Sequence, residues 1–257
     1  MDLDSDEEID PITMIFPADG GDGEETQAVC DQDHRHYIKS IDSTVVIRQL
    51  PSRGLSFQLW PAATTLVTLL DDHRLNPSSN TRLSALLSPS NRNGPPRILE
   101  LGSGTGLAGI VAAATLGAYV TVTDLPHVIP NLQFNVEANA GLVKSGSVLA
   151  APLRWGEAED MEKLGREYDV VLASDVVYHD HLYEPLLESL SYLLGGDGRS
   201  AFVMAHLRRW KKEAAFFKRA RKLFNVEILF QEAPADGSRV GVVVYGFIGK
   251  QHTTSEI

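Results

Sequence analysis

The sequence predicts an α/β fold built on a seven-stranded, mostly parallel sheet with helices on both faces. Seven apolar runs follow one another from residue 98 onward, and most are separated by segments of helical length. This is the pattern of parallel strands joined by crossover helices. A glycine-rich turn follows the first run, so the sheet is expected to be Rossmann-like. The runs are residues 98–101, 119–123, 148–151, 170–173, 201–205, 226–230 and 242–247.

The two ends of this domain have simpler signals. Only residues 231–241, with Pro234 and an Asp-Gly pair, separate the last two runs, so these are expected to form an antiparallel hairpin at a sheet edge. Before the core, residues 45–47 are β-branched and indicate a short strand. Pro61 follows Trp60 and precedes an apolar stripe, which indicates the first turn of a helix.

The 257 residues are expected to form one domain over residues 39–250. Residues 1–38 are acidic, rich in glycine and poor in large apolar side chains, so we expect a disordered tail. Residues 76–96 are rich in Pro, Ser, Asn and Gly and are expected to be a surface-loop insertion. Residues 251–257 are assigned to a C-terminal tail.

Charge and cysteine content limit the partners and the compartment. The net charge of −11 repels nucleic-acid phosphates and favours basic protein partners. The single cysteine, Cys30, cannot form an internal disulfide, and the first residues lack the pattern of a secretory signal. The uncharged stretch 101–123 contains too many glycines and hydroxyl residues for a membrane span. A cytoplasmic or nuclear location without membrane contact is therefore expected.

The first strand and the turn after it predict a nucleotide-binding loop. Gly102, Gly104 and Gly106 let the backbone turn sharply and approach a ligand closely. Read from Gly104, the same letters also match the dinucleotide pattern GxGxxG, so the loop alone does not decide the cofactor. Asp124 ends the next strand, where a carboxylate can accept hydrogen bonds from ribose hydroxyls. Glu100 lies within the strand before the loop and is expected to orient the loop or the cofactor, because burying it unpaired would be costly.

Further candidate residues follow the third and fourth strands. Trp155 comes after the third run, at the edge where open α/β sheets bind ligands. Asp175 and Tyr178 follow the fourth run and are expected at the same edge. The cation cluster at residues 207–212 is interpreted as the solvated start of a helix. The histidines at positions 34, 36, 179 and 181 have no zinc-site spacing, and no metal is expected.

Five separate strings of this sequence resemble those of the family-16, methyltransferase-like protein lysine methyltransferases of the seven-β-strand class, and most closely the methyltransferase-like 21 group. The resemblance covers roughly residues 40–248. The strings are LWPAA at 59–63, ILELGSGTG at 98–106, TDLP at 123–126 with residues 131–135, LRWG at 153–156 and SDVVY at 174–178.

The resemblance implies S-adenosylmethionine as the cofactor and lysine side chains of a cytosolic protein, such as a chaperone or a translation factor, as the methyl acceptors. It places Asp175 and Tyr178 at the catalytic end, where Asp175 would orient the amine and Tyr178 would supply a ring wall and a hydroxyl. The residues implied to contact the cofactor are Trp60, Gly102, Ser103, Gly104, Asp124, Trp155 and Ser174, and Glu100 joins them from the argument above.

Other functions stay open from the sequence. The same cofactor could serve a small-molecule or protein-arginine methyltransferase, and the GxGxxG reading allows a nicotinamide dehydrogenase. A cofactor-binding interaction module without turnover is a further alternative. The sequence does not determine the substrate protein or the oligomeric state.

Overall fold

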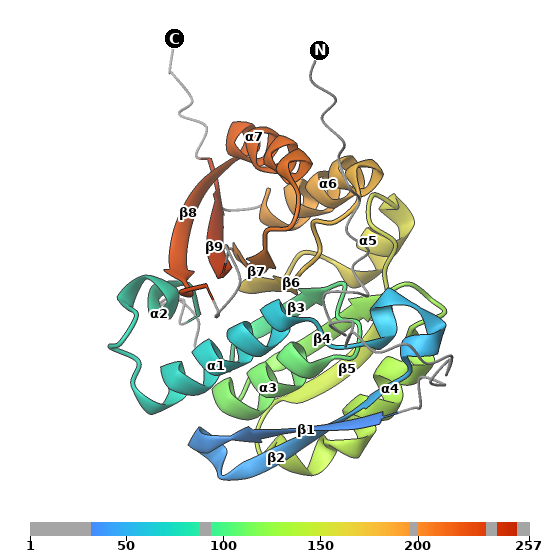
Figure 1. Cartoon of the computed structure of the whole chain (residues 1–257), viewed down its shortest axis with the longest axis vertical. Coiled ribbons are helices and arrows are strands. Elements are labelled where there is room, and N and C mark those ends of the chain that lie inside the picture. The colour runs from blue at the N-terminus through green and yellow to red at the C-terminus, as the bar shows by residue number, and fades with distance from the viewer. Residues whose placement is uncertain (1–31, 88–93, 196–199, 235–240, 251–257) are drawn as a thin grey trace, which may run out of the picture.

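The computed structural model describes residues 32–87, 94–195, 200–234 and 241–250. Its main sheet has seven strands in the order β5-β4-β3-β6-β7-β9-β8, and β9 runs in the opposite direction to the other six. The predicted fold class and the terminal hairpin are therefore confirmed (Figure 1). The sheet strands are β3 (Arg97–Leu101), β4 (Tyr119–Asp124), β5 (Ser147–Pro152), β6 (Val170–Ser174), β7 (Ala201–Leu207), β8 (Phe224–Gln231) and β9 (Val242–Gly249).

Helices cover both faces of this sheet because the central strands are apolar on both sides. In β6, Val170 and Leu172 belong to one core cluster, whereas Val171 and Ala173 belong to the other. The first cluster joins the sheet to α1 (Pro61–Leu75), α3 (Leu107–Leu116) and α4 (Ile129–Ala138). The second joins it to α5 (Ala158–Leu164), α6 (Tyr183–Leu194) and α7 (Ala214–Leu223). Two buried layers thus hold one sheet, as strands buried on both faces require.

The chain direction brings the predicted site to one edge of the sheet. The parallel strands β3, β4, β5 and β6 all end at the same edge. The chain moves outward from β3 to β4 and β5, and then returns to place β6 on the other side of β3. Such a reversal leaves a crevice beyond the strand ends, where open α/β sheets bind their ligands.

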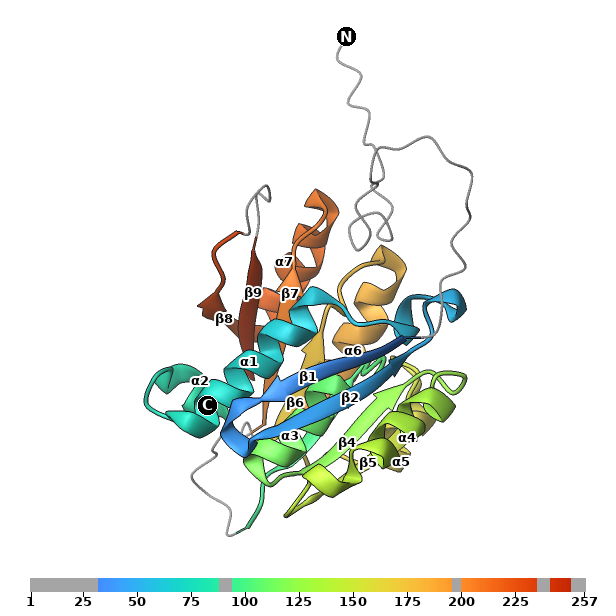
Figure 2. The same cartoon turned by 60° about the horizontal axis from the view of Figure 1, so that its bottom comes forward.

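Residues 32–38, expected to belong to the disordered tail, instead form strand β1 (Gln32–Ile38). This strand pairs antiparallel with β2 (Ser43–Gln49) in a separate two-stranded sheet, which lies along α3 and α4 (Figure 2). The sequence concealed this strand because Ile38 is the only buried side chain among residues 33–38. Residues 1–31 of the expected tail, and the tail 251–257, lie outside the described residues.

The expected loop insertion at 76–96 contains a helix, α2 (Thr81–Leu87). Asn80 caps it, because the backbone N–H of Leu83 donates to its side-chain oxygen at 3.0 Å. Asn80 also donates to the carbonyl of Leu229 in β8, and Leu83 and Leu87 are buried. The polar residues before position 81 were therefore a helix start signal. Residues 88–93 of the insertion lie outside the described part of the chain.

Two asparagines of α4 and the asparagine that caps its C-terminal end hold the free edge of β2. Asn131, Asn135 and Asn139 follow one another at intervals of four residues, so they lie on one face of the helix. Asn139 accepts a hydrogen bond from the backbone N–H of Val46 and donates to its carbonyl, and Asn135 does the same with Arg48. Asn131 accepts from the Arg48 guanidinium at 2.8 Å. The side-chain amides thus substitute for a neighbouring strand and anchor the two-stranded sheet to the core.

Replacing Asn135 by alanine should lower the free energy of unfolding by about 2–4 kcal/mol, because buried partners lose their hydrogen bonds. Asn135 is fully buried and also donates to the carbonyl of Thr105 in the glycine loop at 2.9 Å. Urea unfolding measures the change. The control is Gln133→Ala on the same helix, whose amide bonds only the exposed Glu137 and which should change stability by about 0.5 kcal/mol or less. Equal effects of the two variants would contradict the anchoring role.

Candidate functional site

A cavity of about 250 Å³ lies at the carboxyl edge of the parallel strands. Its walls come from the segment before α1 and from the residues that follow β3, β4, β5, β6 and β7. All ten residues predicted for the site line this one cavity: Trp60, Glu100, Gly102, Ser103, Gly104, Asp124, Trp155, Ser174, Asp175 and Tyr178. The fold thus brings together five sequence segments, and the individual roles of these residues stay predictions.

The glycine loop turns at residues with backbone angles that favour glycine. Gly102 and Gly104 have φ angles of 59° and 55°. A Cβ atom on Gly102 would lie 2.9 Å from the ring of Trp155, so only a bare backbone fits between that indole and the loop. The loop therefore presents its main chain to the cavity, as the sequence predicted.

Asp124 holds the loop and faces the cavity at the same time. Its carboxylate accepts the backbone N–H of Gly104 at 2.8 Å and that of Leu125 at 2.8 Å. Burial raises the pKa of this carboxyl group, and the two N–H donors oppose the rise. Each carboxylate oxygen keeps a further lone pair. Asp124 can therefore accept hydroxyl donors from a ligand while it fixes the loop.

Glu100 lies beneath the loop and is 1% exposed. Its carboxyl accepts the backbone N–H of Gly109 at 3.0 Å, which ties β3 to the first turn of α3. Burial raises the pKa of Glu100 to about 8, so the group holds its proton at neutral pH. A Cβ atom on Gly109 would lie 2.3 Å from Val122, so this third glycine of the GxGxxG string serves close packing of the helix on the sheet.

Two tryptophans form aromatic walls of the cavity. Trp60 donates its ring N–H to the carbonyl of Leu55 at 3.0 Å, which fixes the indole just before α1. Trp155 follows β5 and packs against the glycine loop at Gly102. The rings can enclose a flat or cationic ligand group.

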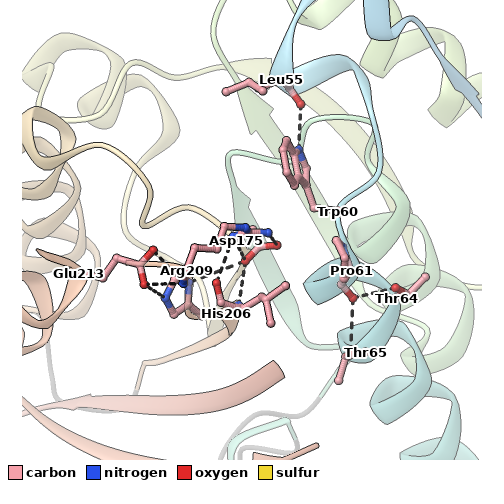
Figure 3. A network of polar contacts seen from close by, with 10 residues as sticks. Leu55, Trp60, Pro61, Thr64, Thr65, Asp175, His206, Arg209 and Glu213 are labelled. Atoms are coloured by element: carbon pink, nitrogen blue, oxygen red, sulfur yellow. Dashed lines mark hydrogen bonds and ion pairs between the residues drawn. The ribbon is translucent and has the colours of Figure 1, made fainter. Parts of the chain in front are cut away.

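Asp175 has a left-handed backbone conformation, with φ of 55°. Such an angle is uncommon for a residue other than glycine and is often found at functional sites. Its Oδ1 accepts the backbone N–H of Leu207 at 2.9 Å and Arg209 Nη1 at 3.2 Å, and its Oδ2 accepts Arg209 Nη2 at 2.9 Å (Figure 3). The side chains of Asp175 and Arg209 are only 3% and 5% exposed. The predicted catalytic carboxylate is thus one half of a buried, bidentate ion pair.

A second carboxylate lies behind this pair. Glu213 is fully buried, accepts the backbone N–H of Arg209 and lies 3.1 Å from Nε2 of His206. Nδ1 of His206 is 3.8 Å from Oδ1 of Asp175, so the imidazole lies between the two acids (Figure 3). The Arg209 guanidinium also lies 5.2 Å from the ring of Trp60. The network therefore connects the ends of β6 and β7 to the start of α1.

The interpretation of residues 207–212 as a solvated helix start is wrong for part of this segment. Lys211 and Lys212 are exposed, as expected, but the side chain of Arg209 is only 5% exposed, and Arg209 lines the cavity together with Trp210. The missed signal is position, because Arg209 directly follows β7 at the edge where the ligand crevice forms.

Tyr178 completes the cavity beside Asp175, and burial raises the pKa of its hydroxyl. Its ring lies 4.8 Å from that of His179, which stacks on His181 at 5.3 Å. Within the residues that the structure describes, no group of three His, Cys, Asp or Glu side chains could hold a metal ion. None of the described helices is both long and apolar enough to cross a membrane.

Comparison with known proteins gives consistent results. Residues 39–223 match the model of a family described as lysine methyltransferase. The chain is 35% identical over 140 residues to protein N-lysine methyltransferase METTL21A of Danio rerio, covering 54% of this chain and 62% of the relative. It is 39% identical over 122 residues to EEF1A lysine methyltransferase 3 of Xenopus tropicalis, covering 48% and 52%. The chain thus spans between half and two thirds of these relatives.

Solved structures share the fold of this chain. A SAM-dependent methyltransferase from Agrobacterium tumefaciens superposes with a TM-score of 0.53, at 17% identity over 88% of this chain and 72% of that one. The predicted resemblance is confirmed, and the dehydrogenase reading of the glycine loop loses its support.

Replacing Glu100 by glutamine should flatten the pH dependence of stability between about pH 5 and 8. In the wild type the native carboxyl keeps its proton up to about pH 8, whereas the unfolded chain loses it near pH 4.5. The free energy of unfolding should therefore fall as pH rises through this window, by up to about 1.4 kcal/mol per pH unit. Glutamine retains an acceptor for Gly109 but has no proton to lose.

Urea unfolding of both proteins at several pH values gives the difference between their free energies of unfolding. Groups that titrate equally in both proteins, such as Asp124, contribute nothing to this difference. The stability of Glu100→Gln relative to the wild type should rise with pH. Parallel curves across the window would show that Glu100 is ionised in the native protein.

Proposed function

This chain belongs to the lysine methyltransferase family, and we propose that it transfers methyl groups from S-adenosylmethionine to lysine side chains of another protein. The observation that carries the proposal is the single cavity in which the loop after β3, the acid ending β4 and the residues after β6 meet. The first two belong to a nucleotide site, whereas Asp175 and Tyr178 provide polar groups for an acceptor.

The residues present fit the proposed cofactor. The bare glycine loop admits a ligand close to its main chain, and Asp124 keeps lone pairs for ribose hydroxyls beyond its two backbone bonds. Trp60 and Trp155 offer aromatic faces to the adenine and to the positively charged sulfur. When bound, S-adenosylmethionine supplies the activated methyl group.

The acceptor end must hold a lysine amine and make its neutral form available. A free lysine amine is protonated at neutral pH and cannot attack in that form. The buried, largely apolar walls near Tyr178 and Trp60 disfavour the charged form and exclude water. Asp175 can orient the amine through its remaining lone pair, since three of about four acceptor positions are already used. Positioning of this kind is the main demand of an in-line displacement.

A protein is the proposed substrate class. Two relatives are named for lysine methylation, one of them for EEF1A, and the net charge of −11 suits a basic surface around the target lysine. EEF1A and a whole-cell lysate are therefore the first substrates to test.

Replacing Asp124 by alanine should weaken S-adenosylmethionine binding at least about tenfold, because charge-assisted hydrogen bonds and the anchor of Gly104 are lost. Isothermal calorimetry measures the affinity, and thermal melting checks the fold. Asp72→Ala, an acid on the exposed side of α1, removes the same charge and should bind normally. Wild-type affinity in folded Asp124→Ala would remove this residue from the cofactor site.

Incubation of the wild type with EEF1A, or with lysate, and isotopically labelled S-adenosylmethionine should place the label on lysine. Mass spectrometry of the labelled protein identifies the residue, and Asp124→Ala at the same cofactor concentration should label far less. Methyl groups found only on arginine, or only on small molecules, would overturn the proposed acceptor class.

A further inference from the structure

We infer that Arg209 is a positioning residue for the proposed reaction: its guanidinium neutralises Asp175 from behind, so that this carboxylate can hold the acceptor lysine amine without trapping it as an unreactive ammonium. The inference rests on the proposed lysine methylation and adds a residue that the sequence prediction left outside the site.

The geometry of the pair gives Arg209 this role. Both terminal nitrogens of the guanidinium donate to the two carboxylate oxygens of Asp175, at 3.2 and 2.9 Å, in the parallel arrangement of a bidentate pair. Oδ1 also accepts the N–H of Leu207, whereas Oδ2 has one protein donor and therefore room for another. Asp175 is among the residues that line the cavity, and the inference places the amine at this oxygen.

An unpaired carboxylate at this place would oppose the chemistry. An opposite charge within about 4–6 Å raises the pKa of an ammonium group by about 1–3 units, which keeps the amine protonated. The guanidinium of Arg209 compensates most of that charge, because it is bonded to both carboxylate oxygens. Asp175 then acts on the amine as a hydrogen-bond acceptor with little net charge.

Arg209 is held in place for this task. Its side chain is 5% exposed, and its Nη1 also donates to the carbonyl of Leu207 at 3.1 Å. The indole ring of Trp60 lies 5.2 Å from the guanidinium. The guanidinium is thus fixed by the end of β7 and by Trp60. A lysine at this position would lack the two parallel N–H donors of the bidentate pair and the planar contact with the indole.

Other titratable groups line the cavity or lie behind the ion pair, and their charges could also affect the amine. Tyr178 and His179 come from the loop after β6, His206 and Glu213 from β7 and the turn before α7, Glu100 and Asp124 from the cofactor end, and Arg154 from the loop after β5. Arg154 pairs with Asp160, and Glu213 accepts from His206 and from the main chain of Arg209. Among the described cations, the Arg209 guanidinium is the one bonded directly to Asp175.

The test is the pH dependence of kcat, which reports groups in the enzyme–substrate complex. EEF1A, or the protein that takes the label in lysate, is methylated at saturating S-adenosylmethionine by wild type, Arg209→Gln, Asp175→Asn and the double variant. In Arg209→Gln the midpoint of the increase in kcat with pH should lie about one pH unit or more higher than in the wild type, because the uncompensated carboxylate keeps the amine protonated. In Asp175→Asn the midpoint should lie lower than in the wild type, because the unpaired positive charge of Arg209 disfavours the ammonium form. The plateau, the maximal kcat at high pH, should also be lower. The double variant should return the midpoint close to that of the wild type.

Arg219→Gln is the matched control, because it removes the same charge from an exposed pair with Glu184 on α6 and should leave the midpoint unchanged. Arg209→Lys retains the charge without the fork and should lower the plateau more than it moves the midpoint. Calorimetry should give each variant an S-adenosylmethionine affinity within a fewfold of wild type.

Lower rates with an unmoved midpoint in Arg209→Gln would reduce Arg209 to a structural support and overturn the inference. If Arg209→Gln does not fold, a midpoint in Asp175→Asn equal to that of the wild type would overturn the inference instead. A wild type that methylates no lysine overturns the proposed function and the inference with it, whereas lysine methylation with unmoved midpoints overturns the inference alone.

Discussion

Buried acidic side chains need hydrogen-bond or charge partners, and this requirement organises the edge of the sheet where the cavity lies. Glu100 accepts the N–H of Gly109, Asp124 accepts those of Gly104 and Leu125, Asp175 takes Arg209, and Glu213 takes His206. Apart from the bond between the adjacent residues Asp124 and Leu125, each joins a strand or its end to another segment at the same edge. The same interactions that make these acids tolerable in the interior therefore fix the glycine loop, the start of α3 and the end of β7.

The cavity exists because the strand order reverses at β3. Its neighbours β4 and β6 carry Asp124 and Asp175 at their carboxyl ends, so one acid lies on each side of the loop after β3. The two acids differ in their partners. Asp124 is bonded only to backbone N–H groups, whereas Asp175 faces a full positive charge. Their environments thus suit the different tasks proposed for them, hydroxyl recognition for Asp124 and amine orientation for Asp175.

Stability and site are also joined through α4. Its asparagines bind the edge of β2, and Asn135 reaches the carbonyl of Thr105 in the glycine loop. The two-stranded sheet of β1 and β2 is therefore connected by a few polar contacts to the glycine loop that lines the cavity. Buried amide networks of this kind fix one arrangement, since any shift would leave polar groups unpaired.

Local patterns along the chain were enough to predict the seven sheet strands and the terminal hairpin, because apolar periodicity and glycine turns are local signals. The ten predicted site residues are all among those that line the cavity, since parallel strands end at a common edge, but Trp60, Ser103 and Ser174 came from the family resemblance and not from a local pattern. The same reasoning missed β1, which buries only Ile38 among residues 33–38, and α2, whose capping residues looked like those of a loop. It also assigned Arg209 to solvent. Only the tertiary structure decided that this arginine meets Asp175, because they are 34 residues apart and the pairing of β6 with β7 brings them together.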